Sequence, residues 1–89
     1  MDDAVTLHPS AFKHGLSAED VTQAWMTGFA RQARLEDDQP ERYLRIGVDT
    51  KGRPVEVVAL VFDQKRTLII HAMPVRKATL DLLASGFHE

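Results

Sequence analysis

Apolar and polar side chains alternate with a period of two over residues 42–49, a pattern typical of a β-strand with one buried face. Two further strands are predicted over residues 55–62, which are almost wholly apolar, and over residues 67–73. Polar residues at 50–53 and 63–66 separate the runs and predict tight turns. We therefore expect an antiparallel meander of three strands, with the middle run at its centre.

The first half of the chain carries the signals of a helix that begins after Ser17. A serine at this position can accept a hydrogen bond from the first N–H groups of a helix, which have no partner within it. Glu19 and Asp20 follow in the first turn, where carboxylates interact favourably with the helix dipole. Apolar residues then recur at helical spacing, and we expect the helix to end within residues 29–32. A short helical turn is predicted before it, over residues 10–14.

Further elements are predicted near both ends of the chain and between the first helix and the meander. Pro74 suits the first turn of a helix and Gly86 suits its end, so a second helix is expected over residues 75–85. Short strands are expected over residues 4–7 and 33–35. Together the elements predict an α+β fold, with an antiparallel sheet of three or four strands and two or three helices packed on one face.

The composition is that of a small globular protein with a single domain over residues 1–89. The absence of cysteine excludes disulfides and thiolate metal sites. We find neither a signal peptide nor an apolar run of membrane-spanning length, so we expect a cytoplasmic protein with no membrane partner. The net charge of −2 is not that of a strongly basic nucleic-acid binder, so any RNA contact must come from a local patch.

The lengths of the turns decide which side chains share a face of the sheet, because side chains alternate along each strand. With two four-residue turns, Asp49 pairs with Pro54 and Phe62 pairs with Thr67. The face expected to pack against the helices is then wholly apolar and comprises Leu44, Ile46, Val48, Val57, Ala59, Val61, Leu68, Ile70 and Ala72. The opposite face is mixed and comprises Tyr43, Arg45, Gly47, Glu56, Val58, Leu60, Phe62, Thr67, Ile69, His71 and Met73.

In this register Arg45, Val58 and His71 form one row across the mixed face, with Arg45 and His71 on the order of 10 Å apart. RNA cleavage without a metal needs a base for the 2′-OH, a cation for the phosphorane and an acid for the leaving oxygen. Histidine ordinarily titrates near neutrality and arginine binds phosphate well, so His71 and Arg45 are candidates for these roles. Each also has a structural interpretation, as a hydrogen-bonded histidine near the sheet edge and as a solvated or salt-bridged arginine.

Four other basic residues are candidates for phosphate contacts. Lys13 and His14 precede the first predicted helix, while Arg76 and Lys77 lie at the start of the second, where an anion can bind. A plain turn and a solvated charge pair are the structural alternatives. Glu19 taken alone is better explained as a helix-start acid than as a general base. The histidines have no metal-ligand spacing and no phosphate-binding loop occurs, so neither a metal nor a cofactor is expected.

Three segments together resemble the BrnT-like toxins, a family with a RelE-like fold from type II toxin–antitoxin systems. Residues 13–20 are similar to the KHG-[IVL]-S-x-E stretch that opens the main helix of the family. Residues 41–47 are similar to its E-x-R strand, and residues 68–72 with 76–79 are similar to its last strand-to-helix passage. The order and spacing of the segments agree over most of the chain.

The resemblance implies a RelE-like fold, metal-independent endoribonuclease activity that arrests growth, and neutralisation by a cognate antitoxin. It matches Lys13 and His14 to a basic pair and Glu19 to an acidic helix-start position. It matches Arg42 or Arg45 to the strand arginine. The candidates for catalysis are Lys13, His14, Glu19, Arg45 and His71. The candidates for RNA binding are Arg42, Tyr43, Arg76 and Lys77.

The chain also departs from the pattern of the family. Its approach to the KHG segment is shortened, and His71 stands where the family often has serine. Met73 replaces an arginine of the family, and Arg76, three residues further on, is the candidate to replace that cation. These departures allow an altered or lost activity.

Three functions are consistent with these observations. The first is a toxin that cleaves RNA, free or bound to the ribosome, and that pairs with an antitoxin. The second is a non-catalytic binding module, such as a degenerate toxin that acts by forming a complex with a protein. The third is an enzyme that acts on a small ligand, which the shortage of chain for a deep pocket disfavours. A homodimer is compatible with the small size of the domain.

Overall fold

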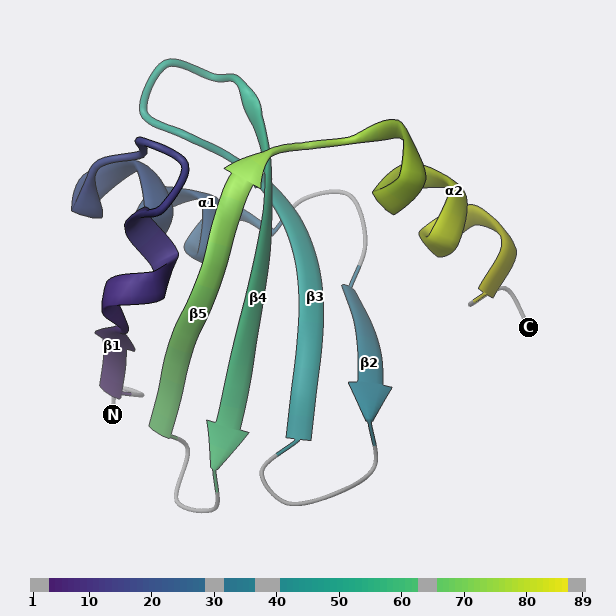
Figure 1. Ribbon diagram of the computed structural model, residues 1–89, viewed down its shortest axis with the longest axis horizontal. Helices are drawn as coiled ribbons and strands as arrows, with labels where there is room; N and C mark the ends of the chain where they lie inside the picture. The colour runs from purple at the N-terminus through teal and green to yellow at the C-terminus, as the bar shows by residue number, and fades with distance from the viewer. Residues whose placement is uncertain (1–3, 29–31, 37–40, 63–65, 87–89) are drawn as a thin grey trace.

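The described part of this computed structural model, residues 4–28, 32–36, 41–62 and 66–86, forms one five-stranded sheet with the strand order β1-β5-β4-β3-β2 (Figure 1). The strands are β1 (Ala4–Leu7), β2 (Gln32–Glu36), β3 (Glu41–Val48), β4 (Pro54–Phe62) and β5 (Arg66–Pro74). The helical elements are the 3-10 helix η1 (Pro9–Phe12), α1 (Ala18–Thr27) and α2 (Lys77–Gly86). The predicted α+β class is confirmed.

The prediction of a purely antiparallel sheet was wrong, because β1 runs parallel to β5 and pairs Ala4 with Arg66 through to Leu7 with Ile69. Parallel neighbours need a long connection, and here most of the chain lies between the two strands. Nothing in the short apolar run of β1 specifies the direction of its partner. The three strands of the predicted meander, β3, β4 and β5, do pair antiparallel.

Helix α1 begins as predicted and ends earlier. The hydroxyl of Ser17 accepts a hydrogen bond from the backbone N–H of Asp20 at 3.1 Å, which caps the first turn. The helix ends at Thr27, where Gly28 follows with a φ of 25° and donates its N–H to the carbonyl of Ala24. The predicted end fell at residues 29–32, of which 29–31 lie outside the described residues.

The turn between β3 and β4 has five residues rather than four, because Val48 and not Asp49 pairs with Pro54. The Asp49 carboxylate explains the extra residue. Its Oδ1 accepts the backbone N–H groups of Lys51 and Arg53, each at 2.9 Å, and its Oδ2 accepts Nε of Arg53 at 2.7 Å. The predicted row was therefore wrong, because Arg45 pairs with Val57 instead of Val58.

The turn between β4 and β5 is one residue shorter than predicted, and a bulge in β5 compensates for the difference. Phe62 pairs with Arg66, one residue earlier than predicted, and residues 63–65 between them lie outside the described residues. A bulge then leaves Ile70 as an extra residue in β5, between the pairs Ala59–Ile69 and Val58–His71. The predicted pairing of His71 with Val58 is consequently confirmed.

Helix α1 packs against the backbone of β3 and covers one face of the sheet. A Cβ atom added to Gly47 would lie 1.8 Å from the carbonyl oxygen of Ala24, so only glycine permits this approach. The buried core on this side comprises Ala11, Val21, Ala24, Trp25, Val55, Val57, Ala59, Ile69 and Ala72. The prediction placed Val57, Ala59 and Ala72 correctly on the helix-packed face.

The two faces of β3 were predicted the wrong way round. Leu44 and Ile46 lie on the face opposite α1, where they form a small cluster with Val58 and Val75. Helix α2 reaches this second face through Thr79, whose hydroxyl donates to the carboxylate of Glu56. The expectation that all helices pack on one face was therefore wrong. Figure 1 shows α1 behind the sheet and α2 extending past β3 and β2.

Candidate functional site

A buried carboxylate lies on the second face of the sheet, at the point where α2 approaches. Glu56 is the one charged residue of β4, and its exposed fraction is 1%. Burying a carboxylate is costly unless hydrogen bonds and positive charges compensate for the lost water. The neighbours of Glu56 supply both.

Both carboxylate oxygens of Glu56 accept hydrogen bonds. Oε2 accepts from Nη2 of Arg76 at 2.7 Å and lies 2.9 Å from Nε2 of His71. Oε1 accepts from the backbone N–H of Arg76 at 3.2 Å, from its Nε at 3.3 Å and from the hydroxyl of Thr79. A single side chain thus connects the middle of the sheet to the end of β5 and to α2.

The charge state of Glu56 follows from these contacts. Burial by itself raises the pKa of the Glu56 carboxyl, but the hydrogen bonds from Arg76, Thr79 and His71 outweigh it and lower the pKa to about 2. The carboxyl is therefore ionised at neutral pH and can only accept hydrogen bonds.

A second histidine lies against His71. The rings of His14 and His71 have centroids 5.6 Å apart and planes at 73°. His14 belongs to the segment between η1 and α1, and η1 is fastened to the bulge of β5 by a 2.6 Å hydrogen bond from the hydroxyl of Ser10 to the carbonyl of Ile70. The bulge in β5 therefore lies directly before His71 and anchors the helical turn that precedes His14. We call His14, Glu56, His71, Arg76 and Thr79 the Glu56 cluster.

The Glu56 cluster borders an open cavity of about 330 Å³. The residues that line this cavity are Arg42, Leu44, Glu56, Val58, Ile70, His71, Arg76 and Thr79. Its walls thus combine apolar side chains with two arginines, a histidine and an ionised carboxylate. Such a combination can hold a polar, anionic group beside a proton donor or acceptor.

Four residues singled out from the sequence meet at this cavity or beside it. His71, Arg76 and Arg42 line it, and His14 contacts the ring of His71. Lys13 is exposed and adjoins His14 in the chain. The two basic segments of the sequence analysis, one before α1 and one at α2, therefore come together around β5.

Arg45 does not belong to this group, because it lies on the opposite face of the sheet from His71. Its Nη1 donates to the carbonyl of Trp25 at 2.7 Å, and its guanidinium lies 3.7 Å from the centroid of the Trp25 ring. Burial lowers the pKa of Arg45 from its ordinary value. The residue covers the last turn of α1, where a cation interacts favourably with the helix dipole. Arg45 and His71 cannot act together on one phosphate.

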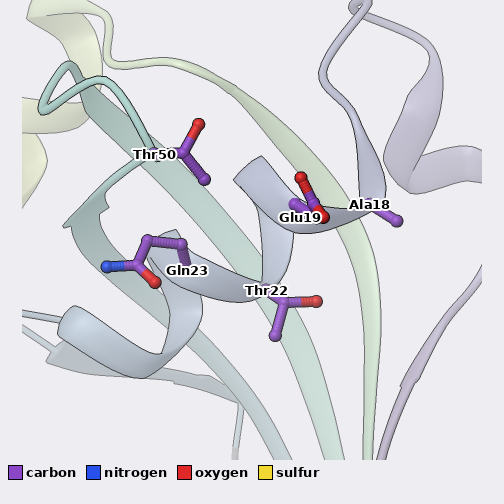
Figure 2. A pocket seen from close by; sticks show the side chains of 5 residues that line it. All are labelled: Ala18, Glu19, Thr22, Gln23 and Thr50. Atoms are coloured by element: carbon purple, nitrogen blue, oxygen red, sulfur yellow. The ribbon is translucent and has the colours of Figure 1, made fainter.

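Glu19 does not line the cavity beside Glu56 either. It lines a different hollow, of about 450 Å³, together with Ala18, Thr22, Gln23 and Thr50 (Figure 2). This hollow lies between the outer surface of α1 and the turn that follows β3. The lining side chains carry no positive charge, so the hollow offers little to a phosphate.

Two candidates for RNA binding have other contacts. The hydroxyl of Tyr43 donates to Oε1 of Glu41 at 2.9 Å, and its ring packs against the core beneath α1. Nζ of Lys77 donates to Oδ2 of Asp81 at 3.0 Å, on the exposed surface of α2. Neither residue lines the cavity beside Glu56.

Glu56 and Thr79 were not identified as site residues from the sequence. Glu56 interrupts an otherwise apolar strand, and a lone acid in such a strand is the signal that could have identified it. Thr79 gave no comparable signal, because only the fold shows that its hydroxyl reaches a carboxylate.

Metal-binding and membrane-spanning features were also sought in the described ranges. Within them, no three histidine or acidic side chains gather in a way that could hold a metal ion. No helix there combines the length and the apolar character needed to cross a membrane.

Comparisons with protein-family models, with curated proteins and with solved structures give no match for this chain. The resemblance to BrnT-like toxins and their RelE-like fold stays a prediction.

Proposed function

We propose that this chain is a metal-independent endoribonuclease, the toxin of a type II toxin–antitoxin pair, and that its active site is the Glu56 cluster with the adjoining cavity. The observation that carries the proposal is the contact between two histidine rings, 5.6 Å apart, beside an arginine fixed to a buried carboxylate. The order of the basic segments that resemble BrnT-like toxins supports the same conclusion.

The reaction that suits these residues is transfer of the phosphodiester to the neighbouring 2′-OH. One imidazole accepts the proton of the 2′-OH while the bond from that oxygen to phosphorus forms. The other donates a proton to the 5′-oxygen as its bond to phosphorus breaks. Arg76, half in solvent, stabilises the charge on the phosphorane. The products are a 2′,3′-cyclic phosphate and a 5′-hydroxyl end, so this step consumes no water.

The test is to induce the chain alone in a bacterial host and to map new 5′-hydroxyl RNA ends in the first minutes. Cells supply ribosomes, in case bound RNA is the substrate. We expect discrete new ends and growth arrest with the unchanged protein, and on the order of 10²-fold fewer ends with His71→Ala, because an acid–base group is lost.

Arg66→Ala is a control substitution in the same strand as His71 but outside the cavity. Arg66 lies at the far end of β5, where its guanidinium lies 5.6 Å from the centroid of the Phe62 ring, and it does not line the cavity. We expect its variant to cut like the unchanged protein. Cleavage that survives in His71→Ala would place the active site elsewhere, and normal growth without new ends would overturn the ribonuclease proposal.

A second candidate function is a binding module without catalysis. The observation that favours it is the second face of the sheet, where several apolar side chains are only half-buried: Val58, Leu60, Phe62, Leu68, Ile70 and Met73. Exposed apolar surface on a small domain often marks a protein-binding site. This function predicts no RNA cleavage but a stable complex with the product of the neighbouring gene, measurable by co-purification of the two proteins.

A further inference from the structure

We propose that Glu56 is a positioning residue that holds His71 with its proton on Nε2, so that Nδ1 is the atom that exchanges a proton with the substrate. The same carboxylate holds Arg76 beside that ring. This inference rests on the proposed function for its catalytic part, whereas the tautomer it assigns is independent of any reaction.

The tautomer follows from the hydrogen bond between the two side chains. Nε2 of His71 lies 2.9 Å from Oε2 of Glu56, and an ionised carboxylate can only accept. Nε2 must therefore carry a hydrogen and donate it. In the neutral ring the lone pair is then on Nδ1, which makes no hydrogen bond within the described part of the chain. The exposed fraction of the His71 side chain, 28%, leaves the ring accessible from the cavity.

Glu56 itself is unsuited to take up the substrate proton. Five hydrogen bonds from three residues already occupy its two oxygens. Removing its charge would also leave the side chain of Arg76 without its partner. The carboxylate therefore orients the imidazole, while the proton moves between Nδ1 and the RNA oxygen.

Arg76 is fixed through one edge of its guanidinium and remains available through the other. Nε and Nη2 donate to Glu56, whereas the Nη1 donors have no partner in the described residues and the side chain is 55% exposed. Unused donors on a fixed guanidinium can bind phosphate oxygens with a defined geometry. A phosphodiester held there would lie beside His71, because both side chains contact the same carboxylate.

The first measurement is the tautomer of His71 in the unchanged protein, from the ¹⁵N shifts of its imidazole at a pH where titration shows the ring to be neutral. We expect the signature of a ring protonated on Nε2. A ring protonated on Nδ1 would overturn the inference, whatever the protein does to RNA. This measurement needs no variant and so does not depend on the folding of one.

The second measurement uses Glu56→Gln, whose neutral amide can either donate to Nε2 or accept from it and so no longer requires a proton there. We expect the preference for Nε2–H to weaken and kcat for an RNA oligonucleotide to fall on the order of 10²-fold. KM should rise as well, because Arg76 loses the charged partner that fixes it. An unchanged tautomer with unchanged kcat would overturn the positioning role while leaving the ribonuclease proposal intact.

Asp49→Asn is the matched control, because Asp49 is a buried carboxylate held by an arginine but does not line the cavity. We expect it to cost stability without altering the tautomer of His71 or kcat. If the unchanged protein cleaves no RNA, the catalytic part of the inference falls together with the proposed function. If RNA cleavage is impaired in Glu56→Gln but not in Asp49→Asn, the proposed function and the positioning role of Glu56 are both supported.

Discussion

At the scale of the residue, Gly47 and Arg45 determine which way β3 faces. Gly47 lets the backbone of α1 approach, and Arg45 covers the ring and the carbonyl of Trp25. Hydrophobicity alone favoured the opposite orientation, because Leu44 and Ile46 are the more apolar set. A glycine within a strand often marks the close approach of another backbone, and this signal was present in the sequence.

Replacing Gly47 with alanine tests this packing. The added Cβ would lie 1.8 Å from the carbonyl oxygen of Ala24, so α1 must move, and we expect a loss of about 1–3 kcal/mol in the free energy of unfolding. Urea unfolding measures it. Gly52→Ala is the comparison: its added Cβ meets nothing, and only its φ of 81° is unfavourable. Equal stability of Gly47→Ala and the unchanged protein would contradict the close contact of α1 with β3.

At the scale of the element, the strands and the cap of α1 were predictable because each depends on residues close in sequence. Alternation identified β3, apolar runs between turn signals identified β4 and β5, and Ser17 marked the start of α1. The pairing register was not predictable, because the side chain of Asp49 lengthens one turn and a bulge at Ile70 adds a residue to β5. The bulge depends on contacts between distant residues, whereas the turn depends on contacts of Asp49 with Lys51 and Arg53, a local signal that the assumed four-residue turn did not use.

The candidate site was predictable only in part, for the same reason. His71, Arg76 and His14 were identified by residue type and by resemblance, since each belongs to a recognisable segment. Their convergence depends on the bulge and on the docking of η1 against β5, which join distant residues. Glu56 was overlooked because its role exists only once α2 has folded back to the sheet.

The docking of η1 on β5 can be weakened at one atom. Ser10→Ala removes the hydroxyl that donates to the carbonyl of Ile70, and we expect a cost of about 1 kcal/mol. Amide hydrogen exchange should become faster over residues 8–15, and RNA cleavage should fall because His14 is less well held. Ser17→Ala costs a similar amount through the loss of the α1 cap but should leave exchange over residues 8–15 unchanged. Equal exchange in both variants would show that Ser10 does not hold this segment.

At the scale of the whole molecule, the two sides of the sheet are stabilised by different forces. Apolar contacts with α1 and η1 hold one side. On the other side, hydrogen bonds to a single carboxylate connect α2 and the end of β5 to β4. A fall in pH should therefore weaken the contacts on the second side, because it protonates the Glu56 carboxylate.

The stability of the whole fold should depend on pH through this carboxyl. The pKa of Glu56 falls from an ordinary 4.5 to about 2 on folding, so its contribution is fully present above pH 4.5 and is lost as the pH falls towards 2. The shift corresponds to about 3 kcal/mol. The stability contributed by Asp20 is lost over the same pH range, because hydrogen bonds from Thr50 lower its pKa to about 2.

Urea unfolding of the unchanged protein and of Glu56→Gln between pH 6 and pH 2.5 separates these contributions. We expect the difference in stability between the two proteins to shrink as the pH falls below 4.5, because protonation removes the charge in one and mutation has already removed it in the other. A difference that is constant over this pH range would show that the hydrogen bonds from its neighbours do not lower the pKa of Glu56.

The parallel pairing of β1 with β5 has a consequence for synthesis. Strand β1 waits for a partner that lies far along the chain, since residues 4–7 pair with residues 66–69. Contacts between such distant segments form late, after the entropy of closing a long loop has been overcome. The histidines meet across this same junction, and α2 must follow before Glu56 is enclosed. During synthesis the cleft therefore cannot assemble until β5 and α2 have both emerged from the ribosome.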